Sequence, residues 1–333
     1  MSEISSTAKL TTDAGASPAR SRAEALGALV PIALKLRDLV VLLLALVTLL
    51  FVLLPLAGDP AQVMAGMDAT PAQIDAIRAK YGFDQPWWVQ YFRYWGNVLQ
   101  FDFGESLASG QPAMEVVLTH LPATLLLTFL AMGFTIAVSV PLGAWLGFRP
   151  DAVTRRIGAW LVFFFQGVPG FVFGLVLIQI FAVNLRWVPS LGYETPAAWI
   201  LPTLALSAFL VPKLTRVVAA NVAEAMREDY VRTARAFGAT RREILWRHAL
   251  PNALLGAAAL IGTQFAFLLS GTVIIERIFS WPGIGWLLIE RTQTLDFPVV
   301  QALAMLIALM VFAVNTITDL SFRYLDPRIK GTN

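Results

Sequence analysis

Cysteine is absent from the 333-residue chain, and histidine occurs only twice. Without cysteine the protein cannot form disulfides, iron–sulfur clusters or cysteine-ligated zinc sites. Charged residues are scarce as well, at 14% of the chain, whereas 57% of the residues are apolar. This composition excludes a soluble domain and is typical of an integral membrane protein.

The two histidines, His120 and His248, are predicted to fall on opposite sides of the membrane. The sequence has no HExxH motif, no GxSxG motif and no carboxylate cluster inside a predicted span. We therefore predict no catalytic residue and no metal site, and a membrane enzyme is the least supported class of function.

No Gly-Lys dipeptide occurs, so the chain lacks the GxxxxGK[ST] loop that binds ATP phosphates. The predicted spans also lack charged residues at their centres, since Lys213, Arg216, Glu276 and Asp319 are expected near span ends. Proton- and charge-coupled carriers usually need an ionisable group at depth. Uphill transport would then rely on ATP hydrolysed by a partner. A sodium-coupled carrier and a channel built from carbonyls stay open as alternatives.

Long apolar runs divide the chain. The first, Leu39–Ala57, has nineteen residues, which as a helix would cross about 28 Å of bilayer. It starts too late for a cleaved signal peptide, so residues 1–37 are predicted to be a cytoplasmic N-terminal arm. We predict an all-α integral membrane protein with six transmembrane helices, at residues 38–57 and at about 121–148, 157–183, 199–222, 253–275 and 298–320.

Residues 58–120, between the first two spans, are soluble in character. The sequence Thr70–Gln73 is a capping box with proline at the first helical position, and it predicts a helix that ends at Gly82. Many aromatic residues follow Pro86. They favour a second helix that lies at the membrane–water interface over a platform on which sugars or bases stack. The aromatics are Trp87, Trp88, Tyr91, Tyr94 and Trp95.

The distribution of basic residues predicts the orientation. Nineteen of the 25 lysines and arginines fall on the side that holds both termini and the loop between the fourth and fifth spans. The positive-inside rule places that side in the cytoplasm. Residues 58–120 are then extracytoplasmic, and residues 321–333 form a cytoplasmic tail.

Asn221–Pro251 is the only long polar stretch between two apolar spans on the predicted cytoplasmic side. We predict a helix up to Phe237 and a turn at Gly238 with positive φ. A second helix should open at a Thr240–Glu243 capping box and end at Pro251. The segment is therefore expected to be two short helices joined by a glycine turn.

The first of these helices has one side with small side chains, at Val231, Ala234 and Gly238. On its other side we expect an ion pair between Glu228 and Arg232. A smooth surface ringed by arginines favours the docking of another protein. A basic loop lying on anionic lipid headgroups is the main alternative. A helix-turn-helix that reads DNA is not expected, because both ends of the segment run into membrane spans, so we predict no nucleic-acid partner.

In sequence this segment resembles the cytoplasmic coupling loop of ATP-binding cassette importer permeases. That pattern is Glu-Ala-Ala, three residues, Gly, nine residues, and then Ile-x-Leu-Pro. The residues at its positions are Arg232, Thr233, Ala234, Gly238, His248, Leu250 and Pro251. Arg232, Thr233 and His248 depart from the pattern. The sequence Arg-Thr-Ala-Arg-Ala-Phe-Gly is similar to the form of this loop in the dipeptide/oligopeptide/nickel subfamily. The resemblance implies contact with an ATPase subunit through Arg232, Ala234, Arg235, Gly238, Thr240, Leu250 and Pro251.

The resemblance covers about residues 38–330, with further similar stretches at 58–60, 103–106, 121–124, 276–285 and 326–328. In the family the 276–285 stretch lies near the outer mouth of the transporter. That similarity implies a place at the extracytoplasmic mouth for Glu276, Phe279, Pro282, Gly283 and Gly285. A re-entrant plug with only a structural role is the alternative.

The clearest helix break is predicted at residues 166–170. A broken helix can line a substrate path. Gln166, Gly167, Pro169 and Gly170 are therefore candidate pathway residues. A kink needed only for packing is equally compatible with these residue types.

Similarity to the family implies a type I importer permease fold, with the transmembrane domain at about residues 115–320, in the cytoplasmic (inner) membrane of a bacterium. The implied partners are a second, homologous permease in a heterodimer, two ATP-binding cassette subunits, an extracytoplasmic solute-binding protein and membrane lipid. No cofactor is expected in this chain, since ATP and magnesium would lie on the cassette subunits. Di- and oligopeptides are the favoured substrates, and nickel chelates, glutathione and oligosaccharides are the alternatives.

Overall fold

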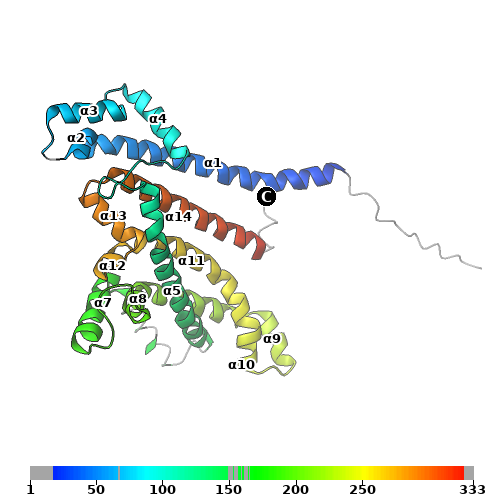
Figure 1. Cartoon of the computed structure of the whole chain (residues 1–333). Helices are drawn as coiled ribbons and strands as arrows, with labels where there is room; N and C mark the ends of the chain where they lie inside the picture. Colours follow the sequence, from blue (N-terminus) through cyan, green and yellow to red (C-terminus); the bar gives the residue numbers. More distant parts are fainter. Residues whose placement is uncertain are drawn as a thin grey trace, which may run out of the picture. The chain divides into compact units, whose positions relative to one another are not determined.

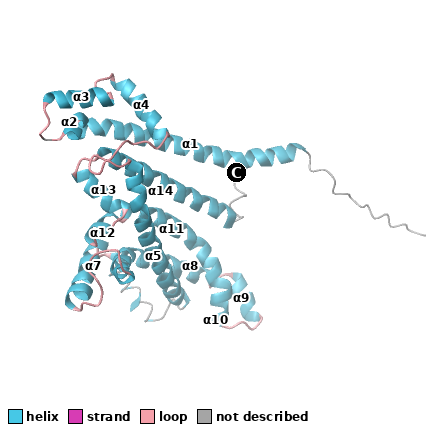
Figure 2. Ribbon diagram, viewed as in Figure 1, coloured by secondary structure: helices cyan, strands magenta, loops and turns pink. Residues whose placement is uncertain are grey.

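The computed structural model describes residues 18–66, 68–148, 153, 157, 158, 160, 164 and 166–325 (Figure 1). Over these residues the regular structure is entirely helical, apart from one isolated bridge between Glu105 and Pro112 (Figure 2). The chain divides into two compact units, Met1–Leu46 and Val47–Asn333. The predicted all-α fold is confirmed.

Five helices among the described residues are long and apolar enough to cross a membrane, judged by length and composition. Four of them correspond to the predicted first, second, fourth and sixth spans, and the fifth span corresponds to a helix that also includes part of the coupling segment. They are Ala33–Leu53, Ala113–Phe148, Pro196–Ala225, Arg241–Leu269 and Phe297–Ser321.

The predicted third span, 157–183, is described mainly in its second half. There, α7 (Gly170–Leu177) continues into a wider helical turn, η1 (Ile178–Asn184), and together they form a shorter apolar helix. Most residues from 149 to 165 lie outside the described part of the chain. The count of six spans therefore stays a prediction.

Helix α1 (Pro18–Ala57) begins well before the predicted span. Proline suits the first turn of a helix, because it has no N–H to leave unpaired there and its φ is already helical. Half of the predicted N-terminal arm is thus helical, and residues 1–17 lie outside the described residues.

Three short helices follow on the predicted extracytoplasmic side: α2 (Pro60–Ala65), α3 (Pro71–Tyr81) and α4 (Trp87–Leu99). The capping glutamine is confirmed, because Oε1 of Gln73 accepts a hydrogen bond from the N–H of Thr70 at 2.8 Å. Helix α3 ends at Gly82, as predicted, and Gly82 has a left-handed φ of 73°. Local sequence signals therefore determine both ends of this helix.

The aromatic helix α4 packs on the end of α1 that follows Leu46. The Tyr91 hydroxyl lies 2.8 Å from Oγ1 of Thr48, and its ring meets the Phe51 ring edge-on at 5.2 Å. Trp87 and Phe92 remain about 70% exposed. An aromatic edge left open in this way fits the predicted position at the membrane–water interface.

An ion pair between Asp59 and Arg78 joins α2 to α3. Oδ1 of Asp59 accepts from the N–H of Ala61 at 3.0 Å and Oδ2 accepts from Nη2 of Arg78 at 2.6 Å. Burial acts to raise the pKa of Asp59. The hydrogen bond from Arg78, the hydrogen bond from the N–H of Ala61 and the positive charge of Arg78 together outweigh burial, so the pKa of Asp59 is lowered. The ionised carboxylate therefore stabilises the folded pair of helices.

We expect this stabilisation to be complete above the unfolded pKa of aspartate, near 3.9. It is lost as the pH falls through the lower, folded pKa. Arg78→Met should bring that pKa back up, so α2 and α3 should open at a higher pH; the effect should be below about 1 kcal/mol, since both groups are partly exposed. Hydrogen exchange of residues 60–81 against pH measures the shift. Lys80→Met is the charge-matched control, and an equal shift there would contradict a specific role for Arg78.

The centre of the membrane domain is the pair α5 (Ala113–Phe148) and α8 (Ile200–Ala225). Glycines on α5 let the two helices approach closely: a Cβ on Gly143 would lie 2.7 Å from Cβ of Val218, and one on Gly147 would lie 2.5 Å from the Ala219 carbonyl oxygen. Small residues at helix contacts are the usual means of close packing within a bilayer. Both helices are longer than the predicted 121–148 and 199–222.

The last third of the chain forms α11 (Leu250–Gly271), α12 (Val273–Ile278), α13 (Ile284–Gln293) and α14 (Phe297–Leu325). The predicted span 253–275 is interrupted at Thr272, where α11 gives way to the short α12. Helix α14 packs against α11 and extends past both predicted limits, 298 and 320. The predicted tail, 321–333, is helical up to Leu325, and its last residues lie outside the described part.

The predicted orientation can be tested because the chain has no cysteine. Ser109→Cys and Ala236→Cys each place one thiol at an exposed position, on opposite sides of the predicted topology. In whole cells an impermeant maleimide should label residue 109 and leave residue 236 unlabelled until the membrane is broken. Labelling of residue 236 in intact cells would reverse the orientation.

Candidate coupling site and buried carboxylate cluster

The segment Asn221–Pro251, predicted to be cytoplasmic, starts in the last turns of α8, which ends at Ala225. A turn over Met226–Glu228 separates it from α9 (Asp229–Ala236), so the predicted continuous helix up to Phe237 is wrong. Glu228 adopts an extended backbone, with ψ 155°, and serves as the N-cap of α9. An acidic residue is favourable there because it faces the positive end of the helix dipole.

The predicted Glu228–Arg232 pair is also wrong, because Glu228 lies outside the helix. Arg232 instead pairs with Asp229, with Nη1 3.2 Å from Oδ1. Both side chains are more than three-quarters exposed. Such a pair stabilises the fold little, and the arginine stays available to another molecule.

Gly238 has φ 87°, which confirms the predicted left-handed turn. Its N–H donates to the Arg235 carbonyl at 3.0 Å, and the N–H of Ala239 donates to the Ala234 carbonyl at 3.1 Å. A Cβ at Gly238 would have no heavy atom within 4 Å of it. Glycine is needed there for its backbone conformation, and space is not the constraint.

The second helix opens as predicted, since Oγ1 of Thr240 accepts from the N–H of Glu243 at 3.2 Å. Glu243 itself pairs with Arg247 at 2.9 Å. The short helix α10 (Arg241–Ile244) then continues through a wider turn, η3 (Leu245–Ala249), directly into α11.

Pro251 does not end this helix, which corrects the prediction. It lies in the first turn of α11, directly after the wide turn η3. A proline ring clashes with the carbonyl four residues earlier in a regular helix, and a widened turn gives it room.

The segment exposes a different face from the predicted one. Val231 is 1% exposed and Ala234 is half-buried, so the small-residue flank of α9 faces the protein. A short amphipathic helix is stabilised by burying that flank. Of the predicted coupling residues, Leu250 is buried in the core between α8 and α11, and the exposed ones are Arg232, Arg235, Gly238, Thr240 and Pro251.

The sequence reasoning did not identify Phe237, which is 87% exposed beside Gly238. A phenylalanine left open at the tip of a basic segment is a candidate anchor for a protein partner. The available signal was an aromatic residue directly before the turn glycine in an otherwise polar stretch.

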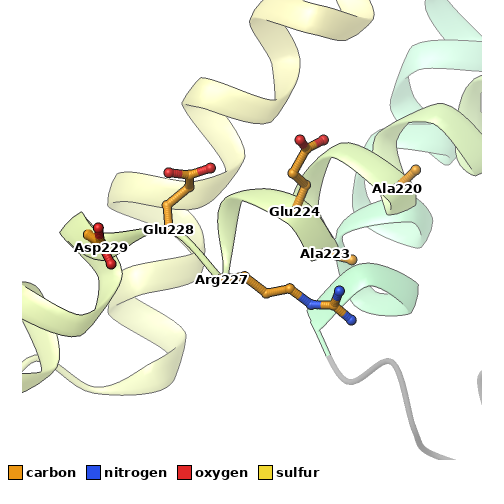
Figure 3. Close-up of a pocket in the computed structure, with 6 residues that line it drawn as sticks. All are labelled: Ala220, Ala223, Glu224, Arg227, Glu228 and Asp229. Atoms are coloured by element: carbon orange, nitrogen blue, oxygen red, sulfur yellow. The ribbon is translucent and has the colours of Figure 1, made fainter.

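A hollow lies beside the segment, where α8 ends and α9 begins (Figure 3). In that view the carboxylates of Glu224 and Glu228 point to the same side, and the Arg227 guanidinium points away from them. Ala220, Ala223 and Asp229 complete its lining.

On the opposite side of the domain, Glu276 of α12 is completely buried. Its Oε1 accepts hydrogen bonds from Oγ1 of Thr124, at 2.7 Å, and from Oγ1 of Thr272, at 2.9 Å. Its Oε2 accepts from the N–H of Trp286 in the first turn of α13, at 2.9 Å. One carboxylate thus joins α5, α12 and α13.

The other predicted mouth residues surround this carboxylate. Phe279 is 1% exposed, Gly283 and Gly285 are buried, and Pro282 is half-buried. A Cβ on Gly283 would lie 2.5 Å from Cδ of Glu276, and one on Gly285 would lie 2.7 Å from Cα of Val273. Both glycines are needed for close approach, so the stretch forms a tightly packed joint.

A second carboxylate, Asp296, holds the long loop before α5 to the start of α14. It is fully buried and accepts from Oγ of Ser106 at 2.5 Å and from the N–H of Leu107 at 3.1 Å. Arg291 lies 3.8 Å away. The sequence marks Ser106 only as part of a stretch similar to the family, and it carries no signal of the partner 190 residues away.

The predicted break in the third span is present. Gln166 is helical, Gly167 and Val168 form a turn, and Pro169 is the N-cap of α7, which starts at Gly170. These residues are exposed or half-buried. Whether they line a pathway stays a prediction.

Comparison with known families accounts for nearly the whole chain. Residues 139–331 match the family described as the inner membrane component of binding-protein-dependent transport systems. Residues 32–128 match the N-terminal membrane component of the same systems.

Individual relatives agree. The glutathione transport system permease protein GsiC of Salmonella paratyphi A is 36% identical over 293 residues, which cover 87% of this chain and 94% of that protein. GsiC of Escherichia coli K12 is 34% identical over 279 residues, which cover 83% of this chain and 90% of that protein.

Solved structures show the same fold at low identity. A chain of the MetNI methionine ABC transporter, in an inward-facing conformation, superposes with a TM-score of 0.55 at 20% identity and covers 64% of this chain and 97% of its own length. The protein therefore belongs to the inner membrane components of binding-protein-dependent transport systems, as an ATP-binding cassette importer permease of the dipeptide/oligopeptide/nickel type.

Proposed function

We propose that this permease imports short peptides, with glutathione as the first substrate to test. The observation that carries the proposal is the similarity to GsiC proteins over most of both chains, since those relatives are named as glutathione transport permeases. Glutathione is itself a tripeptide, so it belongs to the substrate class favoured from the sequence. Nickel chelates and oligosaccharides stay as alternatives.

In this proposal the energy comes from two ATP-binding cassette subunits that dock on the segment Asn221–Pro251. The exposed Arg232, Arg235 and Phe237 at its tip support docking, because they offer charge and an uncovered ring beside a rigid turn. A second, homologous permease and an extracytoplasmic binding protein complete the assembly.

The experiment is uptake into vesicles that contain the permease, its second permease and the cassette subunits, with binding protein outside and ATP inside. Glutathione and a tripeptide of ordinary α-linkages are compared at equal concentration. ATP-dependent accumulation of either supports import of short peptides, and a preference for glutathione identifies the subclass.

An ion-coupled carrier or a channel is the competing function. Accumulation by this chain alone under a sodium or proton gradient would establish a carrier and contradict the proposal. Equilibration without accumulation, independent of ATP, would establish a channel.

A further inference from the structure

Lys213 lies at the middle of a membrane helix, although sequence reasoning expected it near a span end. Helix α8 runs from Ile200 to Ala225, which places Lys213 about 20 Å along the axis from its first residue and about 18 Å from its last. The predicted span 199–222 already contained Lys213, and α8 is uninterrupted across Pro212. An ionisable side chain at such depth is costly, and in known membrane proteins it usually has a function.

The ammonium group of Lys213 has a neutral hydrogen-bond partner. Nζ donates to Oε1 of Gln264 on α11 at 2.7 Å and lies 5.8 Å from the ring centre of Phe209. Among the described residues no carboxylate comes within ion-pair distance of it. The positive charge is therefore not neutralised by the part of the chain that the structure describes.

Gln264 is only 7% exposed, and its Nε2 has no hydrogen-bond acceptor among the described residues. A buried amide donor left unpaired costs free energy, so packing alone does not account for a glutamine here. Its contact with Nζ does account for it, since the carbonyl end fixes the position of the ammonium group. Gln264 is thus a positioning residue for Lys213.

Lys213 belongs to an open stripe along α8 that carries three charged residues, Lys213, Arg216 and Glu224. Its neighbours at helical spacing, Phe209, Arg216, Ala220 and Glu224, are exposed, and Lys213 is half-buried. The stripe ends at the hollow of Figure 3, which Ala220 and Glu224 help to line. Charged side chains at depth face a protein interior or water rather than lipid.

We propose that Lys213, positioned by Gln264, is a carboxylate-binding site in the translocation passage, where it takes the terminal carboxylate of a passing peptide. The proposal rests on the proposed import of short peptides and deepens it. An ammonium group with spare donors can form a charge-assisted hydrogen bond with a carboxylate. A site with one cation and a neutral amide binds weakly enough to release its ligand, which a passage requires.

The charge and the access of water are tested without any substrate. Phe209→Cys supplies a single thiol beside Lys213 in a chain without native cysteine. The complete assembly, with cysteine-free partners, is treated with an anionic and with a cationic methanethiosulfonate. The ratio of anionic to cationic rates should be about tenfold higher with Lys213 than with Lys213→Met, for charges about 6 Å apart in water.

Both other outcomes overturn the proposal. Equal ratios in the two backgrounds would mean that a carboxylate of the partner permease already neutralises Lys213. No reaction with either reagent would mean that lipid or protein covers the stripe.

Transport then tests the ligand. Uptake of a tripeptide is compared with uptake of its C-terminal amide by the native assembly, by Lys213→Met and by Lys213→Arg. Because the binding protein is the same throughout, its own preference cancels in the ratio. Lys213→Met should lower the ratio of acid to amide uptake roughly tenfold, as for loss of one charged hydrogen bond, and Lys213→Arg should retain it.

An unchanged ratio in Lys213→Met would contradict the assigned ligand. If the native assembly shows no ATP-driven uptake of any peptide, the proposed function fails instead, and the thiol measurement still decides whether Lys213 faces a water-filled passage as an unneutralised charge.

Discussion

Gly238→Glu should abolish import while the protein still inserts in the membrane at nearly normal levels. A non-glycine residue at φ 87° costs about 1–2 kcal/mol. That cost is small for a helical domain of this size, and no atom lies within 4 Å of the new Cβ, so the fold should survive. The added carboxylate would project from the exposed tip beside Arg235 and Phe237, where a cassette subunit is proposed to dock.

The measurements are membrane content, ATP-dependent uptake and co-purification of the cassette subunits. Uptake should fall at least tenfold, with weaker cassette binding or with ATP hydrolysis that no longer responds to loaded binding protein. Gly238→Asn is the matched control, because asparagine tolerates the left-handed conformation and adds no charge. Normal transport by Gly238→Glu would show that the segment does not couple to an ATPase and would favour the lipid-facing alternative.

Glu276→Ala should destabilise the protein more than Gly238→Glu does. It removes the acceptor of the Thr124 hydroxyl, the Thr272 hydroxyl and the Trp286 N–H, all in buried or partly buried positions. Unpaired donors of this kind cost about 1–3 kcal/mol each. We therefore expect a loss of about 3 kcal/mol or more, seen as a lower temperature of thermal aggregation in detergent.

Two further variants separate the hydrogen bonds from the charge. Glu276→Gln should be intermediate, since one amide oxygen can still serve the two threonines while the amide NH2 opposes the Trp286 N–H. Glu115→Ala, which alters a glutamate in the first turn of α5 outside this cluster, should leave the aggregation temperature unchanged. An unaltered temperature for Glu276→Ala would contradict the structural role of the cluster.

Local signals explain what the sequence predicted well. The capping box at Thr70, the helix end at Gly82, the left-handed Gly238 and the break before Gly170 each depend on backbone chemistry within a few residues. Apolar runs located the membrane helices for the same reason. Their ends were less accurate, because helices such as α5 and α8 continue beyond the apolar run on contacts with other helices.

Contacts between residues far apart in the chain explain what the sequence did not predict. The pairing of Asp296 with Ser106, and of Lys213 with Gln264, joins residues far apart in the chain, and no local pattern announces it. The side of α9 with small residues is predicted to be an outer surface, but it faces the protein. Residue spacing shows that Val231 and Ala234 share one side of the helix and does not show whether that side is buried. The wide turn η3, which lets the helix pass Pro251, likewise has no short-range signature.

The two attachments of the segment Asn221–Pro251 to the membrane helices differ in continuity. On one side, Met226–Glu228 interrupt the helix and form a joint between α8 and α9. On the other, α10, η3 and α11 follow one another without a non-helical residue and form a single rod from Arg241 to Gly271. A displacement of the tip should therefore pass directly to α11, whereas the joint interrupts its path along the chain to α8. Gln264 lies on α11 and Lys213 on α8, so a movement of α11 relative to α8 would alter the hydrogen bond between them.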